Sequence, residues 1–239
     1  MESILNLQLS LFGSFINIKP KNDIVMQLLT NLQEENFIPG TVDIAVIDAD
    51  TKQISSESRL QMVSEDKTVN IVFLQDRIDF NYNLLPNTPQ AKNLKALVNN
   101  MANLIQKVFA TFVSTTGNRL AFNCRFLTDK KTKESIETFI QRYSHIPSFF
   151  QNSNVTEWNI HFNSPEEVPV SEDTKEVCNR IVEFGIMQST MDDSKSIGVV
   201  FDINTLANNL ELRFNYENLM FFANQNIDFI CSALSEIEG

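Results

Sequence analysis

Arg77–Tyr82 reads RIDFNY and is followed by a long helical pattern, and this strand-then-helix order is the basis of the predicted fold. Leu212–Tyr216 reads LRFNY, ends on the same three letters, and is also followed by a helical pattern. In both stretches apolar and polar residues alternate, which is typical of a strand with one buried face. The shared letters suggest that one folding unit is used twice, which predicts that Phe80 matches Phe214 and that Tyr82 matches Tyr216.

The two helical patterns each carry an apolar stripe. Pro89–Phe112 places apolar residues at three- and four-residue steps, and Glu217–Leu234 is the most apolar helical stretch of the chain. Thr88 is the predicted cap of the first helix, with Pro89 in its first turn. Such stripes have to be buried against another layer, here a sheet.

The first half is predicted to open with a strand and a helix. Leu5–Leu11 alternates apolar and polar residues, which predicts a half-buried strand that continues to Pro20. Asn22 or Asp23 is then predicted to cap a helix, and Pro39-Gly40 predicts a turn.

Two predicted hairpins complete the first half before its long helix. Polar turn residues separate the strand-like runs of each hairpin. The paired runs are Val42–Ile47 with Arg59–Val63, and Asn70–Leu74 with Ile78–Tyr82.

The second half is predicted to repeat this order. Its strand-like runs are Leu120–Leu127, Trp158–Phe162, Val177–Met187, Ile197–Ile203 and Leu210–Phe214. Thr128 or Asp129 is the predicted cap of the helix after the first run. Ser164–Thr174, which is acidic and contains proline, is predicted to be an exposed loop.

These patterns predict an α+β fold made of pseudo-duplicated β-α-β-β-β-β-α units, with antiparallel sheets packed against long amphipathic helices. We expect the halves to be residues 1–116 and 117–239, packed intimately enough to form a single domain. The alternative is two unrelated α+β domains that both end on helices. The two sheets could join edge to edge or pack as separate halves.

The composition indicates a globular chain with a large core. Among 239 residues, 43% are hydrophobic and 19 are phenylalanine, which argues against disorder. Only 6 glycines and 7 prolines are present, which argues against linkers and a Gly-rich phosphate loop. The net charge of −11 opposes direct binding to nucleic acid, which needs a basic face.

Cysteine usage and the apolar segments indicate a soluble cytoplasmic protein. Cys124, Cys178 and Cys231 form no C-x-x-C pair, so we expect buried thiols in a reducing compartment. Met1–Asn6 has no basic region typical of a secretory signal. Leu219–Leu234 is interrupted by polar residues and is too short to span a bilayer, so no membrane contact is expected.

One acidic motif suggests an enzyme. Asp48-x-Asp50 follows an apolar run, as the nucleophile and the acid/base of haloacid-dehalogenase phosphatases do, but Lys52 stands where that motif has Thr or Val. A polar hairpin turn explains the same residues. A divalent-metal version would add Asp192 and Asp193. We predict no catalytic set, no metal site and no cofactor.

Polar strand faces provide the candidates for partner binding. Alternation places Arg77, Asp79 and Asn81 on one face of their strand, and His161 on a polar face of another. Trp158 is the single tryptophan and is a candidate hot spot near a strand start. The alternatives are the solvated side of a sheet for the polar residues and core or edge packing for Trp158.

Three blocks resemble a sporadically distributed, uncharacterised bacterial family of similar length. They are Asn70–Tyr82, Gly117–Phe126, and Val199–Ile203 with the Phe-rich helix that closes the chain. The family's Arg-Tyr-Ile-Asn motif at the third strand is replaced here by Arg119–Cys124. The resemblance implies an α+β bacterial protein that is inherited patchily, as genes of mobile elements or phage defence are.

Three functions follow as hypotheses. The first is a non-enzymatic protein-interaction subunit or adaptor of a larger bacterial complex, with other protein subunits as partners. The second is a small-molecule-binding protein with an apolar cavity between helices and sheet. The third is a metal-dependent hydrolase that uses Asp48 and Asp50. The sequence carries no signal for the oligomeric state.

Overall fold

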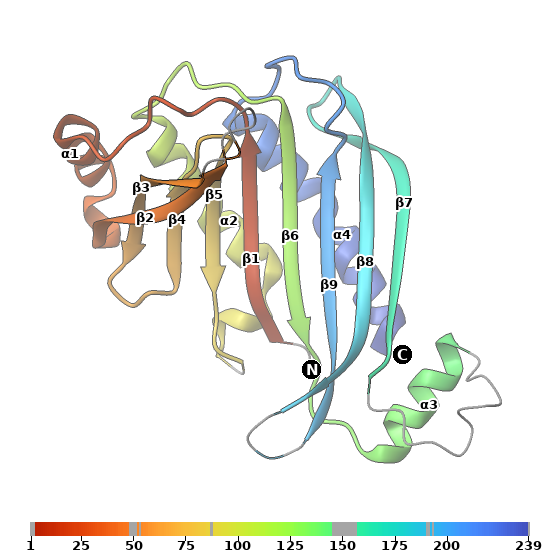
Figure 1. Cartoon of the computed structure of the whole chain (residues 1–239). Helices are drawn as coiled ribbons and strands as arrows, with labels where there is room; N and C mark the ends of the chain where they lie inside the picture. The colour runs from red at the N-terminus through yellow and green to blue at the C-terminus, as the bar shows by residue number, and fades with distance from the viewer. Residues whose placement is uncertain are drawn as a thin grey trace.

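The computed structural model describes residues 3–47, 52, 54–86, 88–144, 157–189, 192 and 194–238. Within these residues, nine strands form one antiparallel sheet in the order β2-β3-β4-β5-β1-β6-β9-β8-β7 (Figure 1). The strands are β1 (Ser3–Phe12), β2 (Phe37–Ile47), β3 (Ile54–Ser64), β4 (Val69–Phe73), β5 (Arg77–Asn83), β6 (Arg119–Leu127), β7 (Asn159–Pro169), β8 (Lys175–Gln188) and β9 (Lys195–Thr205). The predicted α+β class is confirmed.

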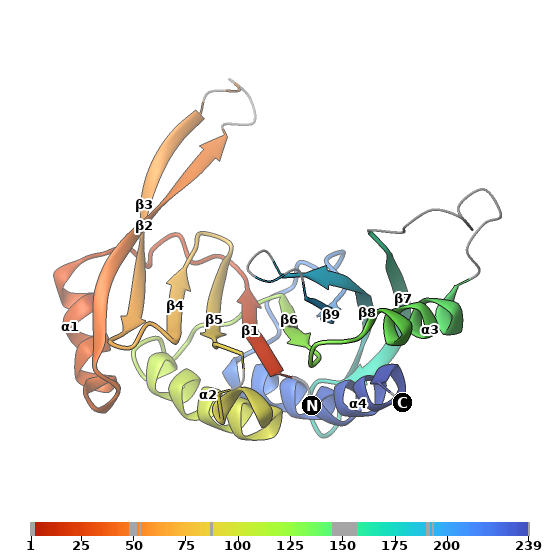
Figure 2. The same ribbon diagram turned by 90° about the horizontal axis from the view of Figure 1, so that it is seen from below.

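Two long helices cover one face of this sheet. Figure 2 shows α2 and α4 next to each other beneath the strands, while the β2–β3 hairpin rises on the opposite side. The helices are α1 (Asn22–Asn31), α2 (Leu94–Phe109), α3 (Lys133–Tyr143) and α4 (Tyr216–Glu238), with short 3₁₀ helices η1 (Gln33–Glu35) and η2 (Gln90–Lys92). No described helix is both long enough and apolar enough to cross a lipid bilayer.

The centre of the sheet joins the two halves edge to edge. β1 pairs with β5 on one side and with β6 on the other. Alternate residues of β1 and β6 point toward α2 and α4 and are buried: Leu7, Leu9, Leu11, Leu120, Phe122 and Cys124. The alternation that predicted these strands therefore also gives the side that faces the core.

Both halves follow one plan, with one difference in strand number. In each half the first strand, β1 or β6, lies beside the last strand, β5 or β9, and a long helix follows. Within the described residues, the first half has four strands after its first helix and the second has three, because Leu210–Phe214 is not a strand. The expected β-α-β-β-β-β-α order is therefore wrong for the second half.

The two Phe-Asn-Tyr segments do not occupy equivalent positions. Phe80 lies in β5 opposite Leu9, whereas Phe214 forms an isolated bridge with Gly117. A Cβ atom added to Gly117 would meet main-chain and side-chain atoms of β1 at less than van der Waals distance, so only glycine fits at this crossing. The prediction that Phe80 matches Phe214, and Tyr82 matches Tyr216, is wrong.

Prolines in the two edge strands account for two further corrections. Pro39-Gly40 lies inside β2 and is not a turn, and β7 runs through Pro165 to Pro169, so the predicted loop Ser164–Thr174 is a strand over most of its length. β2 and β7 are the two edges of the sheet. A proline without an N–H is tolerated there because one side of the strand has no ladder to complete.

The helix starts differ from the predicted caps by a few residues. α1 follows Lys21, with no side-chain cap from Asn22 or Asp23. α2 is capped by Asn93, not Thr88, and α3 by Thr132, not by Thr128 or Asp129. For α2 and α3, a residue later than the predicted one has its side-chain oxygen within reach of the free N–H groups of the first turn.

A buried arginine fixes the base of the β2–β3 hairpin. β1 ends at Phe12 and not at Pro20, and the segment after it packs against Arg59 of β3. The Arg59 guanidinium is fully buried and donates hydrogen bonds to four main-chain oxygens and one carboxylate: those of Phe15, Ile16, Phe73, Leu74 and Glu57. These bonds tie the segment after β1 to β3 and β4.

Two of the three thiols are buried as predicted. Burial raises the pKa of the Cys124 thiol well above its usual value, and burial followed by the nearby Glu176 charge raises that of Cys178 to about 12. Cys231 is exposed on α4, which corrects the prediction for that residue. Helix α4 has only one side turned to the sheet, so residues on its outer side meet solvent.

Candidate functional site

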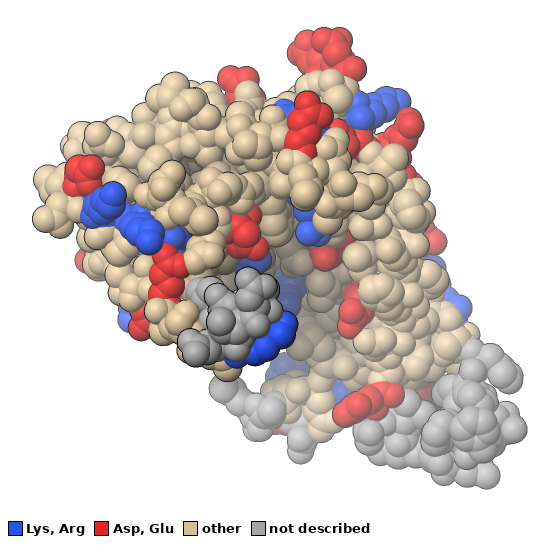
Figure 3. Space-filling model, turned by 45° about the horizontal axis from the view of Figure 1, so that its top comes forward, with Lys and Arg blue, Asp and Glu red and all other residues tan. Residues whose placement is uncertain are grey.

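The face of the sheet opposite α2 and α4 carries no described helix. We call it the open face. Figure 3 shows that the molecule is hollowed here, with Lys and Arg atoms in the hollow. The side chains at alternate positions of the central strands form it: Asn6, Gln8, Ser10, Arg77, Asp79, Asn81, Arg119, Asn123, Arg125, Asn179, Glu183, Asp202 and Asn204.

A row of amide side chains crosses the middle of the open face. Asn81 of β5 is opposite Gln8 of β1, Gln8 is opposite Asn123 of β6, and Asn123 is opposite Asp202 of β9. Asn70 of β4 continues the row beyond Asn81. Neighbouring strands lie about 4.8 Å apart, so these groups form a continuous polar line across the sheet.

The amides of this row are available to a ligand. Within the described part of the chain, no group forms a hydrogen bond with the side chains of Gln8, Asn81 and Asn123. The Oδ1 atom of Asn70 is shielded from solvent and has no described partner. Each amide offers a carbonyl acceptor and two N–H donors.

Beside the row, Asp79 is held by two neighbours. The Ser10 hydroxyl donates to its Oδ1 atom at 2.6 Å, and Arg77 Nε donates to its Oδ2 atom at 2.9 Å. Burial alone would lower the pKa of Arg77, but the hydrogen bond and charge of Asp79, together with Asp76, raise it overall. Arg77 and Asp79 therefore form an ion pair with no net charge. Of the three binding candidates predicted on this strand, Asn81 is the one whose side chain is free to bind a ligand.

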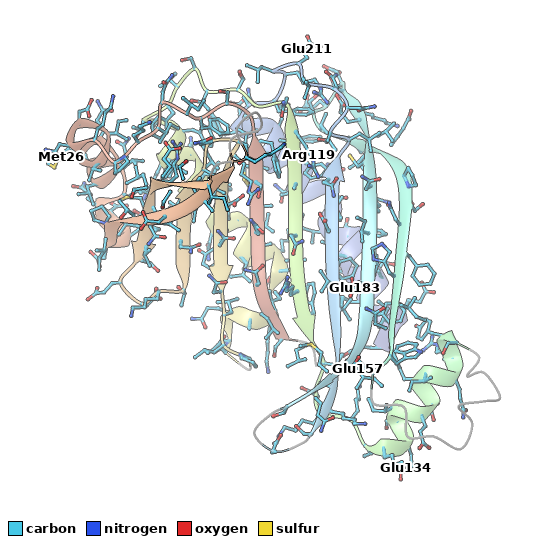
Figure 4. All side chains as sticks on the ribbon, viewed as in Figure 1. Met26, Arg119, Glu134, Glu157, Glu183 and Glu211 are labelled. Carbon is cyan, nitrogen blue, oxygen red and sulfur yellow. The ribbon has the colours of Figure 1, made fainter. Side chains whose placement is uncertain are left out.

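Arg119 marks one end of the open face (Figure 4). Its Nε donates to the Thr205 carbonyl at 3.1 Å and its Nη2 to Asn204 Oδ1 at 2.9 Å. Its guanidinium lies 4.7 Å from the centre of the Phe12 ring, and that of Arg77 lies 5.7 Å from the same ring. Arg119 is thus held in place by neutral groups and not by a carboxylate.

A small pocket of about 250 Å³ lies toward the other end, where Figure 4 places Glu183. Arg125 of β6 lines it, and Val200 of β9 lies between Arg125 and Glu183 in the sheet. Glu183 accepts a hydrogen bond from Asn159 at 2.8 Å, and His161 Nδ1 lies 3.6 Å from it. His161 therefore stands on the open side of the sheet, as predicted, near its outer edge.

Trp158 belongs to an aromatic cluster. Its ring packs edge-on against Phe139 of α3 and at a tilt against Phe184 of β8, and its Nε1 donates to Ser144 Oγ at 2.9 Å. Tyr143 completes the cluster against Phe184. These contacts match the edge-packing alternative and fasten α3 to the sheet.

The acidic motif of the hydrolase hypothesis falls largely outside the described residues, which include neither Asp48, Asp50 nor Asp193. Asp192 is described, and it forms an ion pair with Lys130 and accepts hydrogen bonds from Ser194. The Lys130 ammonium, then Ser194, hold the pKa of Asp192 well below its usual range. No cluster of three metal-ligating side chains occurs in the part of the chain that the structure describes.

A larger pocket of about 630 Å³ lies on the other side of the molecule. It is bounded by the start of β2, the β3–β4 turn and α2, and polar residues outnumber apolar ones among those that line it. The polar lining residues are Glu35, Asn36, Ser64, Glu65, Asp66, Thr68, Tyr82, Asn100 and Asn103.

Comparison with known proteins adds no function. No known protein-family model matches this chain, and no curated protein matches it.

Several residues of the open face were not among the predicted site residues. Arg119, Asn123 and Arg125 alternate with buried residues of β6, so their shared face was visible in the pattern. Gln8 was visible in the same way in β1. What the sequence lacked was the pairing of β1 with β6, which places these side chains beside Asn81.

Proposed function

We propose that this protein is a non-enzymatic interaction protein, a subunit or adaptor of a larger bacterial complex, whose open face binds a partner polypeptide. The observation that carries the proposal is the row of amide side chains without partners on a hollowed sheet face. A folded domain normally satisfies its shielded polar groups internally or with water. Such a row is well suited to a ligand that brings its own donors and acceptors.

A polypeptide backbone has the matching chemistry. Each residue of an extended chain presents one N–H donor and one C=O acceptor, and an Asn or Gln side chain can accept from the first and donate to the second. Gln8, Asn81 and Asn123 offer these groups from three adjacent strands. This supports main-chain recognition of a partner segment.

The charge of the open face argues against nucleic acid as the partner. Three arginines on it, Arg77, Arg119 and Arg125, are matched by three carboxylates, those of Asp79, Asp202 and Glu183. The open face is therefore formally neutral within a chain of net charge −11. Phosphate-backbone binding needs an excess of positive charge.

We also retain, as a proposal, that residues 1–116 and 117–239 are copies of one unit. Its support is now the strand order, in which β1 and β6 meet at the centre and β5 and β9 flank them. A reducing cytoplasm is the proposed location, since Cys124 and Cys178 are free thiols buried in the core.

The proposal is tested by affinity capture from the source cells with a blocked open face. Asn123→Trp fills the centre of the face, and Lys95→Trp on the exposed side of α2 is the matched control. We expect wild type and Lys95→Trp to retain the same stoichiometric partner protein and Asn123→Trp to lose it. Capture of no protein partner by the wild type, or equal capture by both variants, would contradict the proposal.

A second candidate function is small-molecule binding in the larger pocket. Its volume of about 630 Å³ falls in the usual range for ligand sites. Native mass spectrometry and a thermal-shift screen test it, with Asn103→Trp as the variant that fills the pocket. A hit whose stabilisation persists in Asn103→Trp would show binding elsewhere.

A further inference from the structure

Strand β6 carries two arginines on the open face, one near each end. Arg119 and Arg125 are six residues apart, so their side chains point to the same side. At about 3.3 Å per residue, the two positions are about 20 Å apart along the strand. Asn123 of the amide row lies between them.

These two arginines differ from the other charged groups of the open face. Arg77 is paired with Asp79, and Glu183 interacts with Asn159 and His161. Arg119 contacts only neutral groups, and Arg125 is exposed with no described hydrogen bond or ion pair from its side chain. Arg119 and Arg125 therefore form no ion pair within the described residues, and the third carboxylate of the face, that of Asp202, accepts a hydrogen bond from Asn204.

The position of the two arginines on one strand gives the direction of a ligand. The β2–β3 hairpin rises along one side of the open face (Figure 2), and β6 lies at the centre of the sheet beside β1. An extended peptide lying along β6 advances at the same rise per residue as the strand. Its residues i and i+6 would then reach Arg119 and Arg125 with side chains on the same side of the peptide.

We infer that the partner segment is an extended acidic peptide with carboxylates six residues apart, one bound by Arg119 and the other by Arg125. Guanidinium groups bind carboxylates through paired, charge-assisted hydrogen bonds. The pocket next to Arg125 gives room for the second acidic side chain. This inference rests on the proposed function, because it names the chemistry of the polypeptide bound at the open face.

Random heptapeptide libraries test the inference with the full chain. One library has Glu fixed at its first and seventh positions, the second has Gln there, and the third has Glu at its first and fourth positions. We expect selection by the wild-type protein to enrich the first library over both others. Peptides so selected should bind about fivefold more weakly to Arg119→Gln and to Arg125→Gln, as for exposed ion pairs, and their binding should weaken with added salt. Arg142→Gln on α3 is the control and should bind them unchanged.

The outcomes separate this inference from the proposed function. Equal enrichment of the Glu and Gln libraries, with binding lost in Asn123→Trp, would overturn the acidic segment and leave peptide binding at the open face intact. Failure of all three libraries would overturn both. A random single-stranded DNA could also compete with the acidic peptides for binding. If its binding depends on Arg119 and Arg125, the ligand of the open face is a nucleic acid and the peptide inference is wrong. Binding of acidic peptides that is unchanged in both arginine variants would contradict the assignment of the two residues.

Discussion

The two halves of the sheet share their centre and differ at their edges. β1 and β6 pair with each other and both present polar side chains on the open face. Outward from them, the first half adds a long hairpin, β2–β3, whereas the second adds β7 and the helix α3, fastened by Trp158. Under the proposed function, the centre of the sheet provides the binding surface and the edges form its walls.

Each half is also locked by a different kind of arginine contact. Arg59 in the first half is fully buried and is bound mainly to main-chain carbonyls. Arg213 in the second half forms a two-point ion pair with Glu176 and donates to the Asn118 carbonyl. The Arg59 contact depends on neutral acceptors that are shielded from solvent, and the Arg213 contact depends on a partly exposed carboxylate.

The largest expected effects come from the two buried phenylalanines of the Phe-Asn-Tyr segments. Phe80→Ala and Phe214→Ala should each lower the free energy of unfolding by about 3–5 kcal/mol, since both rings are buried and a cavity remains. Urea unfolding measures both. Similar losses would show that the segments are equally important to packing although they occupy non-equivalent positions. A loss below about 1 kcal/mol for Phe214→Ala would contradict its placement in the core.

The arginine locks should differ in size. Arg59→Met should cost about 3–5 kcal/mol because the carbonyls of Phe15, Phe73 and their neighbours lose their donors inside the protein. Arg213→Met should cost about 2–3 kcal/mol, since water can reach the carboxylate that it leaves behind.

Lysine substitutions test how each arginine contact depends on charge and on the number of donors. Lysine has one ammonium group and cannot match the several N–H donors that Arg59 uses. Arg59→Lys should therefore be little more stable than Arg59→Met. Arg213→Lys retains the charge opposite Glu176 and should restore more. If Arg59→Lys were as stable as wild type in urea, the main-chain lock would be wrong.

A smaller, pH-dependent effect is expected in the β3–β4 turn. The Ser64 hydroxyl, followed by the Thr68 main-chain N–H, lowers the pKa of Asp66. A carboxylate whose pKa is lower in the folded state than in the unfolded state stabilises the fold at pH values above the unfolded-state pKa. That stabilisation is lost as the pH falls through the folded-state pKa. Because solvent screens this exposed carboxylate, Asp66→Asn should cost only about 0.5 kcal/mol at neutral pH, and its difference in stability from wild type should close as the pH falls below about 4. A gap that is constant across this range would contradict the role of the carboxylate.

Local patterns predicted most strands correctly and failed where the sheet edge or a loop decided the structure. The alternation in Leu5–Leu11 and Leu120–Leu127 gave β1 and β6 and their buried sides. Pro39-Gly40 and Ser164–Thr174 have the composition of turns, and only the position at an edge allows a strand there. Leu210–Phe214 alternates like a strand, but among the described residues it pairs only through the single bridge between Phe214 and Gly117.

The candidate face was predictable only in pieces. Alternation correctly placed Arg77, Asp79 and Asn81 on one side of β5. Their association with Gln8 and Asn123 depends on pairing between segments far apart in the chain, which no local pattern encodes. No local pattern shows that Asp79 is bound by Ser10 and Arg77 whereas the Asn81 side chain has no partner among the described residues.

Site-specific photo-crosslinking tests the central claim, that the open face binds a partner polypeptide, most directly. A benzophenone amino acid replaces Asn123 in the centre of the open face or Lys95 on the outer side of α2, and the protein is irradiated in its source cells. The account predicts one protein adduct of defined mass from position 123 and none from position 95. No adduct at position 123, or the same adducts at both positions, would contradict it.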